Sequence, residues 1–206
     1  MELFILSLSA LFSILNPIGT LPVFVSLTKD KVKIELTYTA MWTSINTAII
    51  LVIAFYVGKE ILFFFNISIE SLKIAGGVII ASSGFALLTG EFQAHKGMKR
   101  KVKEDASTRH DIALTPLAMP MLAGPGSMSL LIAYHQEYPQ FSDQVILTLS
   151  ILAVCMITFI LLMTARSIVK ILGPSGLNAL SRLIGFIVIT IGVEYILSTL
   201  VKVLDL

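Results

Sequence analysis

Charged residues are scarce in this chain: they make up 14% of its 206 residues, whereas soluble domains carry about 25%. Hydrophobic types make up 56%, and the mean hydropathy is +0.90. So little polar surface excludes a soluble domain, a disordered chain, a coiled coil and a nucleic-acid-binding module. Cysteine is nearly absent as well. With Cys155 alone, neither a disulfide framework nor a cysteine-based zinc or iron–sulfur centre can form, and we expect no metal and no cofactor.

Long apolar runs are what the sequence has in abundance. A helix needs about 20 residues to cross the hydrocarbon of a bilayer, and open strands cannot satisfy their backbone groups in lipid. Six runs approach or exceed this length: 3–28, 36–58, 74–90 with a start near 69, 112–136, 144–165 and 183–201. The sequence therefore predicts an all-α membrane protein with six transmembrane helices.

Lysine and arginine are distributed unevenly between the two sides of this arrangement. The segments 29–33, 91–111 and 166–182 hold 12 of the 15 basic residues, and the other side holds Lys59, Lys73 and Lys202. Cytoplasmic loops carry the excess of positive charge. We therefore expect both termini outside the cell and the basic loop 91–111 in the cytoplasm, where it could also bind anionic lipid or a partner.

The predicted helices form two groups of three, residues 1–90 and 112–206, on either side of loop 91–111. Because three is odd, the second group must enter the membrane from the opposite side, as inverted repeats do. Two sequence similarities between the groups agree with a repeat. Pro17 and Pro125 are 108 positions apart, and the segments 73–76 and 182–185, each a basic residue followed by glycine three positions later, are 109 apart. We expect two inverted three-helix repeats.

Prolines and glycines gather in the middle of the first and fourth runs. The first reads Asn-Pro-Ile-Gly-Thr at 16–20, and the fourth reads Ala-Gly-Pro-Gly-Ser at 123–127. Proline lacks the N–H that a helix needs and pushes on the carbonyl four residues earlier, while glycine lets the chain leave helical angles. We expect both helices to be broken at mid-membrane, although a single proline in a membrane helix is often only a packing feature.

A broken helix presents two opposite electrical ends, free N–H groups on one half and free carbonyls on the other. Two such breaks can hold a small zwitterion without a charged side chain, and their glycines leave little room for a bulky one. In the second run, Asn46 is also a candidate for substrate binding, because its amide has donors and acceptors to satisfy. Thr43, Ser44 and Thr47 of the same run are expected to serve mainly in packing. The predicted substrate-binding residues are Asn16, Pro17, Gly19, Thr20, Asn46, Ala123, Gly124, Pro125, Gly126 and Ser127.

Glu194 is the one acidic or basic residue deep inside a predicted span. An ionisable group at that depth is costly and is expected to face protein or water. One interpretation is a carboxylate that couples transport to protons, with sodium as the other possible ion. The other is a protonated or hydrogen-bonded structural acid in the helix bundle.

The two Pro/Gly motifs, together with Ile-Ala-Gly-Gly at 74–77 and Arg-Leu-Ile-Gly at 182–185, resemble the signature segments of the MarC family, also called the small neutral amino acid transporter (SnatA) family. The resemblance covers essentially the whole chain. It implies two inverted three-helix repeats in a prokaryotic plasma membrane and, in some members, transport of small neutral amino acids such as glycine and alanine. Glu194 departs from the family pattern, where a polar amide is common.

These observations favour a secondary active transporter of the glycine, alanine and serine class, working by alternating access and coupled to protons. Within transport, the alternative is an exporter or channel for another small solute. Outside it, the alternatives are an intramembrane enzyme or a structural membrane protein. No sequence motif of a hydrolase, a metalloprotease or a nucleotide-binding loop is present, so we expect no enzyme. The oligomeric state is left open.

Overall fold

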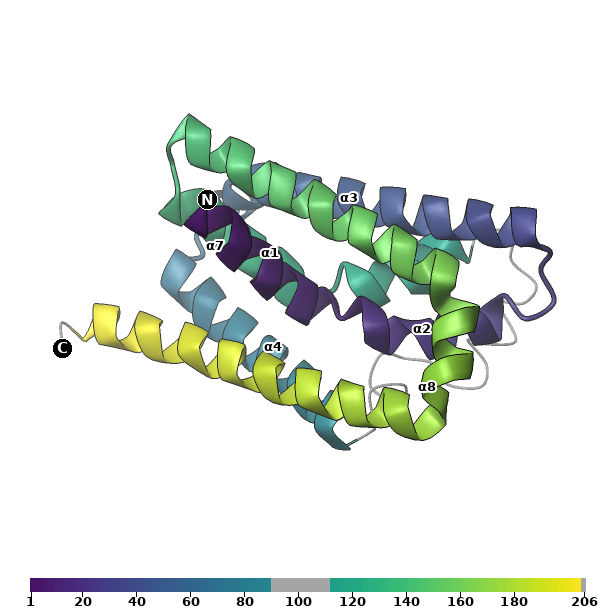
Figure 1. The fold of residues 1–206 in the computed structure, drawn as a ribbon. Coiled ribbons are helices and arrows are strands. Elements are labelled where there is room, and N and C mark those ends of the chain that lie inside the picture. The colour runs from purple at the N-terminus through teal and green to yellow at the C-terminus, as the bar shows by residue number, and fades with distance from the viewer. Residues whose placement is uncertain (90–111, 205–206) are drawn as a thin grey trace.

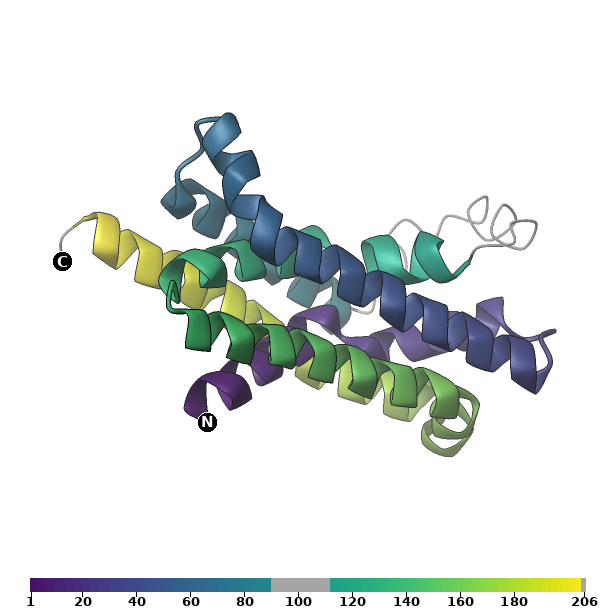
Figure 2. The ribbon, with the colours of Figure 1, turned by 90° about the horizontal axis from the view of Figure 1, so that it is seen from above.

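The computed structural model describes residues 1–89 and 112–204, and the basic loop 91–111 lies outside them. Helices dominate the described part, in which no strand occurs. They are α1 (Glu2–Leu15), α2 (Pro17–Leu27), α3 (Lys33–Phe64), α4 (Ile69–Thr89), η1 (Ala113–Leu122), α7 (Pro125–Glu137) and α8 (Phe141–Val203). Most run roughly along one long axis (Figures 1 and 2), and the prediction of an all-α chain is confirmed.

Four of the described helical segments are long and apolar enough to cross a membrane: α3, α4 and the two segments of α8, Phe141–Gly173 and Ser175–Val203. The other helices form two bent pairs. The bend is 41° between α1 and α2 and 63° between η1 and α7, and each pair passes the same test of length and hydropathy when taken together. The described part therefore has four candidate spans, or six if each bent pair crosses as one, and both bends lie at the predicted motifs.

A sharp turn at Gly173 divides α8. This residue has φ 62° and ψ 177°, in the left-handed half of conformational space that glycine enters without steric cost. The chain reverses direction there, and the second segment runs back beside α4 (Figure 1). Both segments extend further than predicted, so Arg166 and Lys170 lie on the last turns of a helix. Long basic side chains tolerate this position because they can reach water past an apolar surface.

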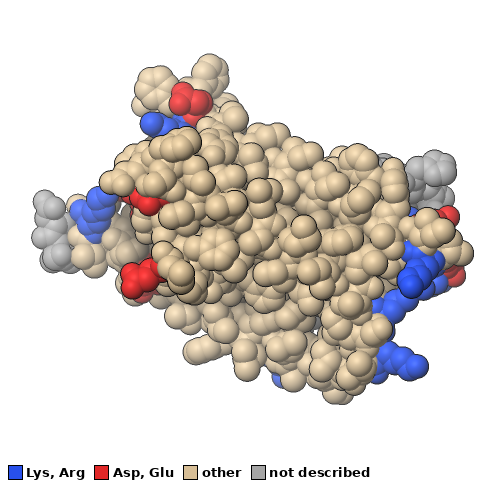
Figure 3. Space-filling view, turned by 45° about the horizontal axis from the view of Figure 1, so that its top comes forward, with Lys and Arg blue, Asp and Glu red and all other residues tan. Residues whose placement is uncertain are grey.

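Charged side chains gather at the two ends of the molecule, and the band between them is almost bare on the face seen in Figure 3. The basic end comprises the turn 28–32 and the turn of α8 near Gly173. Here the Arg166 guanidinium donates to the carbonyl oxygens of Thr28 (2.6 Å) and Lys31 (2.9 Å). At the basic end, lysine and arginine outnumber the acidic residues Asp30 and Glu35, whereas the mixed end, with the α3–α4 turn and the C-terminus, carries both signs in comparable number. An apolar belt between charged ends is the surface that a membrane-spanning chain needs.

Two pairs of glycines let α4 and the second segment of α8 cross at very short range. A Cβ on Gly77 would lie 2.7 Å from the carbonyl oxygen of Gly192, and a Cβ on Gly84 would lie 2.7 Å from that of Gly185. Membrane helices associate through such small residues because lipid provides no hydrophobic drive between them. We call these four residues the glycine crossing. Ile80 lies between the two contacts and is fully buried.

We expect Gly84→Ala to destabilise the protein, since its methyl group would press on backbone that can move only if the helices separate. Overpacking of this kind costs about 1–3 kcal/mol, more than the gain of about 1 kcal/mol in helix propensity. Thermal unfolding in detergent measures the change. Ser82→Ala, on the exposed side of the same helix, is the control. If Gly84→Ala unfolds at the wild-type temperature, the crossing does not hold the two helices together.

Candidate functional site

Asn16 forms the first break. Its backbone lies in the left-handed region, with φ 46° and ψ 62°, which asparagine tolerates better than most residues. Its N–H donates to the carbonyl oxygen of Phe12 (3.0 Å) and ends α1. Its side-chain Oδ1 accepts from the N–H of Gly19 (3.1 Å) and caps α2, which starts with Pro17. The same residue therefore terminates one helix and begins the next.

Gly19 and Thr20 complete this turn. A Cβ on Gly19 would lie 2.3 Å from Nδ2 of Asn16, so glycine is what leaves space for the capping amide. The Thr20 hydroxyl donates to the carbonyl oxygen of Asn16 (3.3 Å). Asn16 and Thr20 are 2% and 0% exposed. The first break is thus a buried polar turn that the side chain of Asn16 caps.

The second break is wider than predicted. The sequence predicts a helix over 112–136 that breaks at 124–126, but its first half, η1, is a loosely wound π-type helix. Thr115 and Met119 have extended angles inside it, because each precedes a proline and the proline ring disfavours helical angles there. The N–H of Ala123 donates to the carbonyl oxygen of Ala118 (2.8 Å). The departure from regular helix therefore begins two turns before the predicted break.

Helix α7 starts cleanly after Gly124, with Pro125 in its first turn. The Gly124 carbonyl accepts from the N–H of Met128 (3.2 Å) and from the hydroxyl of Ser127 (2.8 Å). The first N–H groups of a helix have no partner within it, so those of Gly126 and Ser127 give α7 a positive end. Gly124 cannot cap them because it has no side chain. Ser127 is buried, whereas Pro125 is exposed.

The two breaks meet inside the protein. A Cβ on Gly126 would lie 2.9 Å from Ile80 Cγ1 and 3.7 Å from Ile14 Cγ2, two residues before Asn16. Ile80 is close to the middle of α4. Figures 1 and 2 place the α1–α2 and η1–α7 junctions side by side near the centre of the molecule. Of the predicted binding residues, the structure thus brings together the two motifs 16–20 and 123–127.

Asn46 and Glu194 lie away from the two breaks. Asn46 is half-buried and lines a cavity of about 410 Å³ near the basic end, together with Lys31 and Trp42. Glu194 is exposed and lines a groove of about 630 Å³ between α1, α7 and the second segment of α8, beside Tyr195. Hydropathy gives the depth of a residue along a helix, but not the face on which it lies.

Thr43, which the sequence analysis assigned mainly to packing, is a buried polar residue of α3. It is fully buried, and its Oγ1 has no hydrogen-bond partner among the residues described. The same holds for Nδ2 of Asn16, the side of the amide not used in capping. By contrast, the hydroxyl of Thr47 donates to the carbonyl oxygen of Thr43 (2.8 Å). The spacing of Thr39, Thr43 and Thr47 on one helix face was the available signal.

The packing of α3 shows the depth at which Thr43 lies. Helix α3 packs along both η1 and α7. Ala40, one turn before Thr43, belongs to the same buried cluster as Leu117 of η1. Leu51, two turns after it, belongs to the same buried cluster as Ala123. Thr43 therefore lies on α3 between a residue that packs in the same cluster as η1 and one that packs in the same cluster as the second break.

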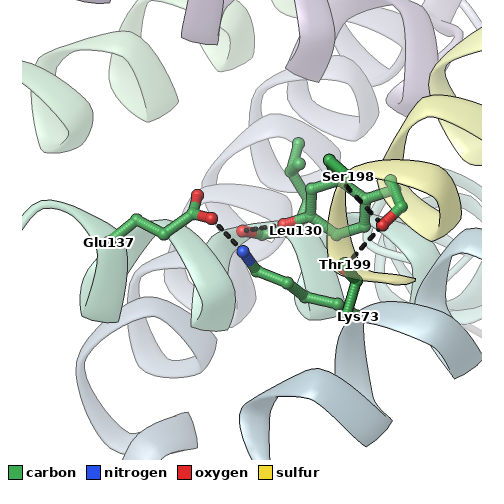
Figure 4. Close-up of polar contacts among 6 residues, drawn as sticks. Lys73, Leu130, Glu137, Ser198 and Thr199 are labelled. Carbon is green, nitrogen blue, oxygen red and sulfur yellow. Dashed lines mark hydrogen bonds and ion pairs between the residues drawn. The ribbon is translucent and has the colours of Figure 1, made fainter. Parts of the chain in front are cut away.

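At the mixed end, polar contacts connect α4, α7 and α8 (Figure 4). Lys73 of α4 forms an ion pair with Glu137 of α7, and its Nζ lies 5.7 Å from the ring centroid of Tyr195. The Tyr195 hydroxyl donates to the carbonyl oxygen of Leu130 (3.4 Å). Next to these residues, the Ser129 hydroxyl donates to the carbonyl oxygen of Leu72 (3.1 Å). These contacts join the first group of helices to the second.

The sequence model of the family described as MarC family integral membrane protein matches residues 1–204, nearly the full length of the chain. The chain belongs to the MarC family. It is 37% identical over 198 residues to a UPF0056 membrane protein of Methanocaldococcus jannaschii, which covers 96% of each chain. It is 31% identical over 208 aligned positions to the UPF0056 inner membrane protein MarC of Salmonella typhimurium, covering 97% of this chain and 94% of that one. No solved structure matches the chain.

We expect Asn16→Ala to destabilise the protein by about 2 kcal/mol, since alanine loses the cap and is disfavoured in the left-handed region, each worth about 1 kcal/mol. Asn16→Gly should recover roughly half, because glycine adopts that conformation but cannot cap. Thermal or denaturant unfolding in detergent measures both variants. Equal stability of the alanine and glycine variants would contradict the left-handed geometry of this break.

Proposed function

We propose that this MarC-family membrane protein is a secondary active transporter of small neutral amino acids, of the glycine, alanine and serine class, in a prokaryotic plasma membrane. The supporting observation is the meeting of two broken helices in the protein interior, where a Cβ on Gly126 would contact both Ile80 and Ile14. Helices interrupted at corresponding positions of two halves are typical of transporter binding sites. The proposed binding residues are those of the two motifs.

The chemistry of the breaks fits a small dipolar solute. The uncapped start of α7 offers the N–H groups of Gly126 and Ser127 to a carboxylate. The end of α1 offers carbonyls to an ammonium group, among them that of Ser13, whose helical partner would have been the missing N–H of Pro17. Nδ2 of Asn16 adds a buried donor. Backbone dipoles can thus bind both charges of an amino acid, and the tight packing around Gly126 favours a small side chain.

Alternating access requires two halves that move about a common site, and we infer that they are inverted repeats. Pro17 and Pro125 are 108 positions apart, and so are Gly77 and Gly185, and Gly84 and Gly192. In the glycine crossing, Gly77 contacts Gly192 and Gly84 contacts Gly185. Replacing each glycine by its equivalent 108 positions away turns the first contact into the second. This is the pattern of an approximate two-fold axis. It favours 108 over the 109-residue offset as the register of the third and sixth helices.

The orientation proposed for the chain follows from its charges. The basic end would face the cytoplasm together with loop 91–111, and both termini would lie outside. The rival functions remain an exporter or channel for another small solute, an intramembrane enzyme and a structural protein. The apposed breaks favour transport among these, because a structural role needs no irregular backbone in the protein interior.

We expect proteoliposomes with the purified protein to accumulate labelled glycine, alanine or serine when a proton gradient is imposed, and less or none with a sodium gradient alone. Gly126→Val should reduce uptake at least about tenfold, because its side chain would enter the space between Ile80 and Ile14. Met128→Val, two residues further, is the control. Both variants must elute and unfold as folded protein. Failure of wild-type protein to move any of the three amino acids under either gradient would contradict the proposal.

Glu194 is proposed as the coupling group, with a structural role as the alternative. In the groove beside Tyr195 it can reach a proton from the mixed end. We expect Glu194→Gln to remove the pH dependence of uptake while glycine binding is retained, since glutamine keeps the size of the side chain but cannot titrate. Counterflow, which needs no gradient, should persist in the variant. Unchanged proton-driven accumulation by Glu194→Gln would exclude it as the coupling residue.

A further inference from the structure

We propose that the cavity lined by Lys31, Trp42 and Asn46 is the entrance from the basic end to the site between the broken helices, and that Thr43 is the residue of α3 that contacts the transported solute. We call this cavity the inner cavity. The identity of the solute rests on the function proposed above. The contact by Thr43 with a transported solute rests on it too, whereas the existence of the route does not.

The inner cavity lies between the first turns of α3 and the start of η1. It measures about 410 Å³, and its described lining consists of Lys31, Tyr38, Thr39, Trp42, Asn46, Ile112, Ala113 and Leu114. The Lys31 ammonium group donates to Thr39 Oγ1 (3.0 Å), which places a positive charge at the wall of the cavity. Such a cavity admits water and small polar solutes and attracts a carboxylate group.

Thr43 continues the polar wall of the inner cavity toward the centre of the protein. It follows Thr39 by four residues and precedes Asn46 by three, spacings that place all three on neighbouring positions of one helix face. Thr39 and Asn46 line the cavity. Thr43 lies beyond its lining and is fully buried. One turn further, Thr47 is also buried, and it lies one turn before Leu51, which belongs to the same buried cluster as Ala123 of the second break.

The buried hydroxyl of Thr43 lacks a hydrogen-bond partner among the described residues. A buried polar group in a folded protein is nearly always hydrogen-bonded, yet Thr43 Oγ1 has no partner in the described part of the chain. Nδ2 of Asn16, at the first break, is in the same condition. A hydroxyl can donate to a carboxylate or accept from an ammonium group. Among the described residues, four buried side-chain atoms lack a partner, the other two being Ser44 Oγ and His135 Nδ1. Thr43 Oγ1, next to the inner cavity, and Asn16 Nδ2, at the first break, are the two that a small polar solute on the proposed route would meet.

Contacts join the two groups of helices at both ends of the molecule. At the mixed end, the Lys73–Glu137 ion pair (Figure 4) and the hydrogen bond from Ser129 to Leu72 hold α4 against α7. At the basic end, the Arg166 guanidinium donates to the carbonyl oxygens of Thr28 and Lys31. The proposed entrance lies beside this second contact, because Lys31 also lines the inner cavity, and it leads inward along the stripe of Thr39, Thr43 and Thr47.

Cysteine labelling tests the route. In a Cys155→Ala background the chain has no cysteine, so Thr43→Cys and Asn46→Cys each carry one thiol. Ile49→Cys, on the exposed apolar side of α3, is the matched control. A membrane-impermeant methanethiosulfonate is applied to inside-out and right-side-out vesicles. We expect Asn46→Cys and Thr43→Cys to react from the side of the basic end at least about tenfold faster than from the other side, and Ile49→Cys to react from neither.

The outcomes separate the route from the solute. If Thr43→Cys reacts no faster than Ile49→Cys from either side, the route is overturned. If it reacts and saturating glycine slows the reaction several-fold, both proposals are supported. If it reacts and none of glycine, alanine and serine slows it, the route stands and the proposed amino acid solute is contradicted.

A second measurement tests contact by Thr43 directly. Thr43→Val keeps the shape of the side chain and removes the hydroxyl, while Thr43→Ser keeps the hydroxyl. We expect valine to raise the KM of uptake about tenfold, the effect of one lost hydrogen bond, and serine to leave KM within about twofold. A role in packing alone would give the opposite order, because valine fills the same space and serine leaves a gap. That order would overturn the assignment of Thr43.

Discussion

Backbone hydrogen bonding away from water is the constraint on which this structure depends. Within lipid or a protein interior, each unpaired N–H or carbonyl raises the free energy of the folded state by several kcal/mol, so a helix can break there only if other groups take over. At the first break Asn16 does so, by donating to Phe12 and accepting from Gly19. At the second, η1 widens until Ala123 bonds to Ala118. Each break is a local solution that leaves a few groups unpaired.

The sequence predicts the spans and both breaks because these follow from local chemistry. Hydropathy fixes where helices cross, and proline at 17 and 125 fixes where they are interrupted. Three features were not predicted. The winding of η1 combines the local effects of two prolines. The burial of Thr43 and the exposure of Glu194 depend instead on the neighbours that α3 acquires and on the rotation of the last helical segment. A membrane helix that is apolar all round gives little information on its buried face.

If the two halves move as proposed, the glycine crossing and the mixed-end contacts determine which parts stay together. At Gly77 and Gly84 the backbones of α4 and α8 already touch, and such close contacts cannot slide without a clash. Helix α7 is joined to α4 through Lys73 and Ser129, contacts made by side chains that can separate. Movement that opens the mixed end would therefore break the α4–α7 contacts and leave the crossing intact.

The two breaks differ in a way that predicts how a solute would be oriented. Asn16 and Gly124 occupy equivalent positions under the 108-residue offset. Asn16 caps the N-terminus of α2 with its own side chain, whereas glycine leaves the N-terminus of α7 uncapped. The start of α7 is thus the better site for a carboxylate, and the end of α1 is the better site for an ammonium group. Capping one break and leaving the other open would make the proposed site asymmetric, as a solute with two different ends requires.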